Sequence, residues 1–280
     1  MKKLWAVLLA CTMAGTLLAG CGNDKKATDS KNKGTTAAEA SSNVSAESKG
    51  TFTVGFDQDF PPMGFVDEKT GEYTGFDLAL AAEVAKRLGL EIKYQPVAWD
   101  AKDMELSSGT IDCIWNGFTM NGREDSYTWS EPYMKNNQVF VVKKDSGINS
   151  AKDLAGKIVD VQTDSSAEAA LKDNAELSGS FAQLIPVADY NTAFMDLESG
   201  AVDAIAMDDT VSSYQIEKRN ADFVVLDETI SAEEYGIGFK KGNTELRDKV
   251  QSTLEEMAAD GTMAKISTEW FGKDITTIGK

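Results

Sequence analysis

Hydrophobic and polar positions follow two different periods along the chain from residue 51 onward. Short runs rich in β-branched and aromatic residues predict strands, whereas apolar residues spaced three and four apart predict helices. In residues 76–88 this spacing places the large apolar side chains on one helical face, and Gly89 then supplies a stop signal. The expected strands are residues 52–56, 91–95, 113–115, 138–142, 158–161, 185–187, 204–207 and 236–239, and the expected helices are residues 76–88, 165–173, 192–199, 210–218, 244–259 and 262–271. Their alternation predicts an α/β fold with mostly parallel strands.

Two nine-residue segments of the chain are similar to each other. Residues 106–114 read LSSGTIDCI, and residues 197–205 read LESGAVDAI. Each reads as the last turn of a helix, a glycine stop and a buried strand. Two copies about 90 residues apart predict two lobes that are built alike, one on each side of a cleft.

The first residues of the chain have the pattern of an export signal. Lys2 and Lys3 precede an apolar stretch, residues 4–18, that is too short and wrongly flanked for a stable membrane span. Small residues then lead to Cys21, and this ending resembles the lipobox of bacterial lipoproteins. The resemblance implies that residues 1–20 are a signal peptide and that the Cys21 thiol carries fatty acyl chains such as palmitate. The alternative is an uncleaved anchor with a chance cysteine.

Residues 21–50 are expected to be this lipidated cysteine and a disordered tether. After Cys21 the segment is rich in Ser, Thr, Ala and Lys, and its one large aliphatic residue is Val44. Such a composition cannot bury enough apolar surface to offset the entropy of ordering the chain. The globular body is therefore expected at the cell surface, lipid-anchored to the outer face of the cytoplasmic membrane of a Gram-positive cell.

Composition excludes several classes of function. The 280 residues carry a net charge of −17, which argues against a nucleic-acid partner. The chain has no His, so it contains no Ser-His-Asp triad and no His-ligated zinc. Apart from Cys11 in the signal peptide and the lipidated Cys21, the single cysteine is Cys113, and its apolar neighbours predict a buried, inert thiol. We expect no disulfide, no metal and no cofactor.

Polar residues follow four of the expected strands. In open α/β sheets, ligands bind beyond the carboxyl ends of the strands. The segments concerned are residues 57–62, residues 116–119 with Arg123, residues 162–166, and the pair Asp208 and Asp209. Together they supply hydroxyls, backbone N–H groups, a guanidinium, carboxylates and an aromatic ring, two contributions coming from each half of the chain.

Several motifs in this order resemble the extracytoplasmic solute-binding proteins, family 3, of ABC amino-acid importers. They are VGFD at residues 54–57 with FPP at 60–62, GFDL at 75–78, Thr119 with Arg123 and WSEPY at 129–133, LAGK at 154–157 and SSAE at 165–168. The resemblance covers about residues 51–272. It implies a two-lobed, type II periplasmic-binding-protein-like fold with two crossing hinge strands, residues 138–142 and 236–239. Lobe 1 would combine residues 51–137 and 236–280, and lobe 2 would be residues 138–235.

The resemblance also implies a role for each candidate ligand-binding residue. Arg123 matches the arginine that pairs with the ligand α-carboxylate, and Asp208 matches the carboxylate that receives the ligand ammonium. The other candidates are Thr119 and the backbone around Asn116 and Gly117 for the carboxylate, Ser165 and Ser166 at a helix N-terminus, and Phe60 and Trp99 as rings that enclose the ligand side chain. Asp57, which follows the first strand, is a further candidate from its position in the chain.

The sequence departs from the family pattern at two positions, and several candidate residues also have a purely structural interpretation. The loop between Thr119 and Arg123 is one residue shorter than usual, so Gly122 is expected to supply backbone freedom. Asp164 occupies a position where glycine is common.

The candidate residues could instead have structural roles. Arg123 could be a surface arginine, Phe60 and Trp99 could be core aromatics, Asp57 could be a solvated loop acid, and Asp208, Ser165 and Ser166 could be helix caps. Trp129 and Tyr133 are interpreted as packing residues.

The acids near the expected pocket favour a cationic ligand. Asp57, Asp59, Asp164 and Asp209 lie in the pocket segments, and Arg123 is the one basic residue there. Unpaired buried carboxylates are costly, so Arg, Lys or ornithine is favoured, with Gln or cystine next.

The expected function is that of a monomeric amino-acid-binding subunit of an ABC importer. The ligand would close the two lobes about their hinge, and the closed form would deliver it to the transmembrane permease subunits. The alternatives are a dehydratase-like enzyme on the same fold and a ligand-sensing module. We expect that the protein is not an enzyme, because the chain has no His and because Asp208 matches the carboxylate that binds a ligand ammonium.

Overall fold

The computed structural model describes residues 50–280. The predicted signal peptide, the lipidation at Cys21 and the tether up to residue 49 lie outside the described residues. Within the described part, no helix is both long and apolar enough to cross a bilayer.

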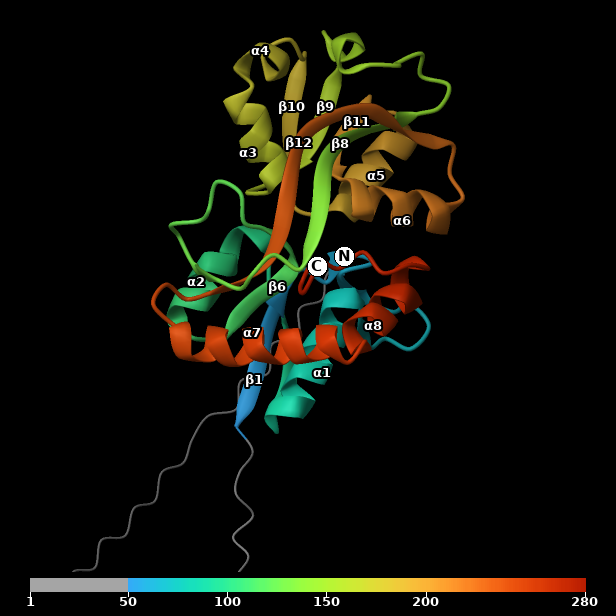
Figure 1. The fold of residues 1–280 in the computed structure, drawn as a ribbon. Coiled ribbons are helices and arrows are strands. Elements are labelled where there is room, and N and C mark those ends of the chain that lie inside the picture. Colours follow the sequence, from blue (N-terminus) through green and yellow to red (C-terminus); the bar gives the residue numbers. More distant parts are fainter. Residues whose placement is uncertain (1–49) are drawn as a thin grey trace, which may run out of the picture. The chain divides into compact units, whose positions relative to one another are not determined.

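Two long antiparallel strands form the centre of a nine-stranded sheet (Figure 1). They are β8 (Met134–Lys143) and β12 (Phe223–Phe239), which pair from Phe223 with Lys143 to Tyr235 with Met134. Beyond β12 lie β6 (Cys113–Thr119), β1 (Thr51–Phe56) and β5 (Glu91–Pro96), and beyond β8 lie β11 (Ala204–Asp208), β9 (Ile158–Gln162) and β10 (Gln183–Val187). The strand β12 pairs with β8 up to Tyr235 and with β6 from Tyr235 to Phe239, so it passes from one group of strands to the other.

Each group of strands is accompanied by its own helices, and the two assemblies are the two lobes. In lobe 1 these are α1 (Phe76–Leu88), α2 (Lys102–Ser108), α7 (Thr244–Ala259) and α8 (Thr262–Phe271), with a 3-10 turn at Trp99–Ala101. Lobe 1 also holds β7 (Thr128–Trp129) and a small sheet of β2 (Asp59–Phe60), β3 (Gly64–Val66) and β4 (Tyr73–Thr74). In lobe 2 the helices are α3 (Ser166–Asp173), α4 (Ala175–Ser178), α5 (Tyr190–Ser199) and α6 (Asp209–Arg219), with a 3-10 turn at Ala151–Leu154.

The two similar nine-residue segments have the same structure, one in each lobe. The helices α2 and α5 end at Gly109 and Gly200, and both glycines have a φ of 80°. In lobe 1 the Asp112 carboxylate accepts a hydrogen bond of 2.7 Å from the Thr53 N–H, and in lobe 2 Asp203 accepts one of 2.9 Å from the N–H of Ile158. Each motif thereby fixes the first parallel strand of its lobe, which confirms the predicted helix end, glycine stop and strand.

The predicted strands and helices are present, but several are longer than expected. The strand expected at residues 236–239 is the end of β12, which begins at Phe223. Its earlier part contains exposed acids such as Asp227 and Glu228, so hydrophobic alternation does not mark it. Cys113 is fully buried, as predicted, and burial raises the pKa of its thiol.

Candidate functional site: a crevice between the lobes

A crevice lies between the two lobes at the carboxyl ends of their strands. Its cavity volume is about 10 Å³, so the lining side chains nearly fill it. Its lining residues are Phe60, Trp99, Gly117, Thr119, Arg123, Gln162, Ser165, Ser166 and Asp208. Eight of these nine were candidate residues from the sequence, and Gln162 lies in a segment that was expected to contribute.

At one end of the crevice the Arg123 guanidinium has no charged partner. Its Nη1 donates to the Thr119 carbonyl at 3.3 Å, and its Nη2 donates to the Asp164 carbonyl of lobe 2 at 3.2 Å. Among residues 50–280 it forms no salt bridge. The preceding turn contains Gly122 with a φ of 79°, so this loop uses glycine freedom as predicted. A planar guanidinium with free N–H groups is suited to an incoming carboxylate.

The start of α3 lies opposite Arg123. Ser165 caps this helix, because its hydroxyl accepts from the Glu168 N–H at 3.1 Å. The Ser166 hydroxyl lies 3.1 Å from the Thr119 hydroxyl of lobe 1 and accepts from Gln138 Nε2 at 2.9 Å. The helix therefore points its N-terminal N–H groups and a hydroxyl toward the anion end of the crevice.

The other end of the crevice is acidic. Asp208, at the end of β11, is 4% exposed, and its Oδ1 accepts from the Tyr235 hydroxyl at 2.5 Å and from Gln138 Nε2 at 2.8 Å. Burial, and secondly the charge of Glu233, raise the pKa of Asp208 well above its usual range. Asp208 stands at the N-cap position of α6, but its side chain makes no cap hydrogen bond. The capping interpretation of this residue is therefore wrong, and its side chain serves the crevice.

Glu233, on the hinge strand β12, was not expected at the site. Its Oε1 accepts hydrogen bonds from Asn136 and Gln138, the same two amides that bind Asp208. Nothing in the sequence pattern distinguishes it from the exposed acids of the same strand.

Backbone support at the centre of the crevice comes from the GFD motif. Asp77 is fully buried, and its Oδ2 accepts from the Gly117 N–H at 2.6 Å and from the Tyr133 hydroxyl at 2.8 Å. Burial raises the pKa of Asp77 to about 7. Gly117 has a φ of 56°, and a Cβ there would lie 3.0 Å from the Phe60 ring. Asn116 is buried and does not line the crevice, since neighbouring residues of strand β6 point to opposite faces of the sheet.

Aromatic rings enclose the middle of the crevice. Phe60 reaches across to Tyr190 of lobe 2 with a ring centroid distance of 5.9 Å. Trp99 packs edge-on against Phe118 at 5.5 Å, and Trp129 packs on the same Phe118 at 4.9 Å. Phe60 and Trp99 are thus both core aromatics and lining residues, whereas Trp129 has the packing position that was predicted.

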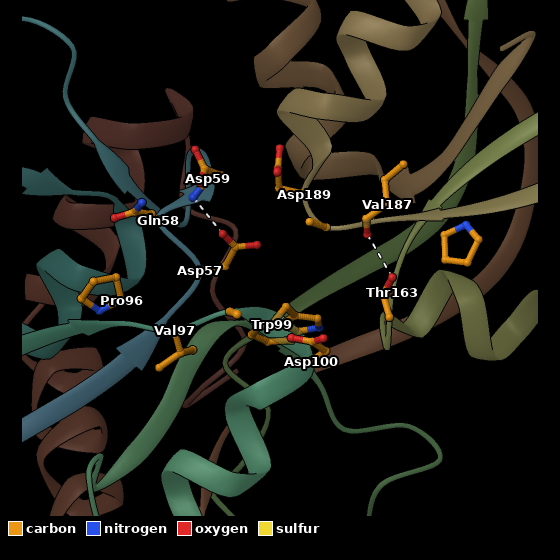
Figure 2. A pocket seen from close by; sticks show the side chains of 13 residues that line it. Asp57, Gln58, Asp59, Pro96, Val97, Trp99, Asp100, Thr163, Val187 and Asp189 are labelled. Carbon is orange, nitrogen blue, oxygen red and sulfur yellow. Dashed lines mark hydrogen bonds between the residues drawn. The ribbon is translucent and has the colours of Figure 1, made fainter. Parts of the chain in front are cut away.

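A larger cavity of about 550 Å³ adjoins the crevice and shares Trp99 with it. Figure 2 shows Asp57 and Asp59 of lobe 1 and Asp189 of lobe 2 around this space. Asp57 lies here rather than in the crevice, and it accepts from Gln162 Nε2 across the lobes at 2.7 Å. Burial, together with the nearby carboxylates of Asp59 and Asp189, raises the pKa of Asp57 to about 6.

Lys102 is a basic residue beside the site that sequence reasoning missed. Its side chain is 2% exposed, lies 4.9 Å from the centroid of the Trp99 ring, and forms a salt bridge with Asp164 of lobe 2. Asp164 has a φ of 58°, so it adopts the left-handed conformation that suits the glycine common at this position. The acid therefore has its own partner. Asp209 lines a separate cavity, so only Asp57 and Asp59 remain of the four acids invoked for a cationic ligand.

Several further contacts hold the lobes against each other. Asn191 Nδ2 donates to Asp59 at 2.9 Å, and Lys218 pairs with Glu68 at 3.2 Å. Together with the pairs described above, these contacts cross the crevice between lobe 1 and lobe 2. The lobes are therefore in a closed arrangement.

Comparisons with known proteins identify the family of the chain. Residues 52–273 match the bacterial extracellular solute-binding proteins, family 3. The chain is 32% identical to the L-cystine-binding protein TcyA of Bacillus subtilis, over 98% of this chain and 99% of that protein. It is 34% identical to the L-cystine-binding protein TcyJ of Escherichia coli, over 81% of this chain and 85% of that protein.

A solved structure has the same fold. It is an ABC uptake transporter substrate-binding protein from Streptococcus pneumoniae with bound histidine, with a TM-score of 0.79 and 36% identity, covering 81% of this chain and 94% of that one. On the match over residues 52–273, the chain belongs to the bacterial extracellular solute-binding proteins of family 3.

Proposed function

We propose that this protein is the amino-acid-binding subunit of an ABC importer and that it captures a free amino acid by closing its two lobes. One observation carries the proposal: an unpaired guanidinium, Arg123, and a buried carboxylate, Asp208, line the same crevice from opposite lobes. An α-amino acid has one negative and one positive end. Its α-carboxylate binds Arg123 with help from Thr119 and the start of α3, and its ammonium binds Asp208.

Hinge closure follows from the same placement. The ligand bridges groups on both lobes, so it binds the closed arrangement more tightly than an open one and shifts the equilibrium toward closure. The hinge is formed by β8 and β12, which run between the lobes. The closed protein then docks on the permease subunits as a monomer and releases its ligand.

The cavity beside the crevice supports a cationic side chain on the ligand. Asp57, Asp59, Asp100 and Asp189 line it, and none of the residues lining it in the described structure is basic. A ligand side chain that passes Trp99 reaches this space, where an ammonium or guanidinium would offset the clustered carboxylates. Arg, Lys and ornithine fit this chemistry. Cystine and Gln come next, since relatives carry the names of cystine-binding and glutamine-binding proteins.

The crevice is assigned to binding rather than catalysis. The charged groups that line it are those a zwitterion requires, and the named relatives are binding proteins. A lipid on Cys21 would keep the protein at the outer face of the membrane near its permease, and the Gram-positive origin belongs to the same proposal.

Isothermal titration calorimetry tests the proposal. The purified protein is titrated with the twenty proteinogenic amino acids, ornithine and cystine. We expect micromolar or tighter binding of at least one polar amino acid, with the cationic ones strongest. Absence of binding to all of them contradicts the transport function, whereas tight binding of an acidic amino acid contradicts the side-chain assignment alone.

A further inference from the structure

Two buried carboxylates lie side by side at the acidic end of the crevice. Asp208 Oδ1 and Glu233 Oε1 accept hydrogen bonds from the same two amides. Gln138 Nε2 is 2.8 Å from each oxygen, and Asn136 Nδ2 is 3.0 Å from Asp208 and 2.7 Å from Glu233. Asp208 is 4% exposed and Glu233 is 5% exposed. The shared donors hold the two carboxyl groups together in the interior.

Within residues 50–280 this pair has no salt-bridge partner. The other titratable groups around it are the hydroxyls of Tyr235 on β12 and Tyr190 on α5, the acids Asp209 on α6 and Glu234 on β12, and Lys135 on β8. Lys135 lines the outer cavity together with Glu233 but forms no salt bridge with it. Two adjacent buried carboxylates do not both stay ionised, so the pair shares one proton. The raised pKa of Asp208 agrees with this conclusion from geometry.

The two acids face different spaces. Asp208 lines the crevice, whereas Glu233 lines an outer cavity with Asn136, Asp209 and Lys135. Only Asp208 can therefore touch a ligand in the crevice, and Glu233 lies behind it.

We propose that Glu233 is a positioning residue for the ligand ammonium: it takes the shared proton when the ammonium reaches Asp208. The proposal rests on the proposed function. The proton leaves the Asp208 carboxyl and bonds to a Glu233 oxygen, which then donates a hydrogen bond to Asp208. The ammonium keeps its three protons, and no proton is exchanged with solvent. The ionised Asp208, the protonated Glu233 and the ammonium then have a net charge of zero. If both carboxyl groups were ionised, one buried negative charge would remain uncompensated.

Substitutions at Glu233 distinguish a proton-holding partner from an ionised ligand-binding acid. Glu233→Gln carries a permanent neutral donor, so calorimetry with the ligand identified above should give an affinity within about threefold of the unmodified protein. Glu233→Ala removes the acceptor of the Asn136 and Gln138 amides and the hydrogen-bond donor to Asp208. It should therefore weaken ligand binding about tenfold or more. Glu234→Gln, the same change on the next residue, is the control and should have no effect.

Infrared difference spectroscopy of the ligand-bound protein supplies a second readout. At pH 8 the carbonyl band of one protonated carboxylic acid should be present in the unmodified protein and in Glu234→Gln, and absent from Glu233→Gln. The inference is overturned if Glu233→Gln weakens binding as strongly as Asp208→Asn does, or if it removes no such band. Absence of any binding by the unmodified protein is a different result, because it contradicts the proposed function and the inference with it.

Discussion

An ion pair between the lobes, with its lysine buried and its aspartate half exposed, should make lobe closure depend measurably on the charge of Asp164. Lys102 of lobe 1 pairs with Asp164 of lobe 2, and Lys102 Nζ also donates to the Trp99 carbonyl at 3.2 Å. The substitution Asp164→Asn removes the negative charge and keeps the side-chain size. It also keeps the left-handed backbone at φ 58°, which asparagine tolerates well. The change therefore tests the ion pair alone.

The expected cost of Asp164→Asn lies between two limits. Exposed ion pairs contribute about 0–1 kcal/mol, and removal of one partner of a buried pair costs about 3–5 kcal/mol. The Lys102 side chain is 2% exposed and that of Asp164 is 54% exposed, so the pair is intermediate. We expect a loss of about 2 kcal/mol, or about 30-fold in the closing equilibrium. Because the pair joins the two lobes, only the closed form loses it, and ligand affinity should fall by up to the same factor.

Distances between spin labels on the two lobes, measured by pulsed electron paramagnetic resonance, report the closed fraction of Asp164→Asn. The control is Glu68→Gln, which also removes a pair across the lobes, but one whose Glu68 side chain is 80% exposed. Its effect should stay below about threefold. Unchanged distance distributions and affinity in Asp164→Asn would refute the role given to the ion pair.

Three further substitutions test other parts of the structure. Asp160 is buried in β9, and its burial and the neighbouring Asp196 raise its pKa to about 7. The folded state therefore holds this proton more tightly than the unfolded state, and the free energy of unfolding falls as the pH rises from about 4 to about 7. Urea unfolding at pH 8 should show Asp160→Asn to be more stable than the unmodified protein by about 2 kcal/mol, with no gain at pH 4, and equal stability at both values would contradict this cause. Gly117→Ala forces a Cβ at φ 56° to within 3.0 Å of the Phe60 ring, so calorimetry should show at least tenfold weaker ligand binding, and unchanged affinity would show that the glycine conformation is not needed. Asp203→Asn weakens the hydrogen bond to the Ile158 N–H, and thermal unfolding should reveal a loss of about 1–2 kcal/mol, which an unchanged midpoint would disprove.

Sequence patterns predicted those helices and strands that are determined by residues close together in the sequence. Hydrophobic periodicity marked α1 at the residues where the structure has it, and the repeated glycine and aspartate marked equivalent helix ends in both lobes. The early part of β12 was missed because its exposed acids conceal the strand alternation, and strand formation there comes from pairing with β8.

The site was predictable to the extent that its residues follow strands or match the family motif. Arg123 and Asp208 were identified in this way, and both line the crevice. Lys102 and Glu233 were missed because each lies at the site next to a residue that is distant in the sequence. Lys102 pairs with Asp164, and Glu233 shares a hydrogen-bond donor with Asp208. The spacing of three residues between Trp99 and Lys102 was the one local signal for the lysine, since such residues are neighbours on a helix.

The central claim is that Arg123 binds the ligand carboxylate while Asp208 binds its ammonium, and a cycle of protein variants and ligand analogues tests it most directly. Calorimetry compares the amino acid, its methyl ester and its α-hydroxy analogue on the unmodified protein, on Arg123→Met and on Asp208→Asn. Each variant should weaken binding of the full amino acid by about 2–5 kcal/mol. Arg123→Met should cost little further affinity for the ester, and Asp208→Asn should cost little for the hydroxy analogue. Equal losses for all three ligands on either variant would contradict the claim.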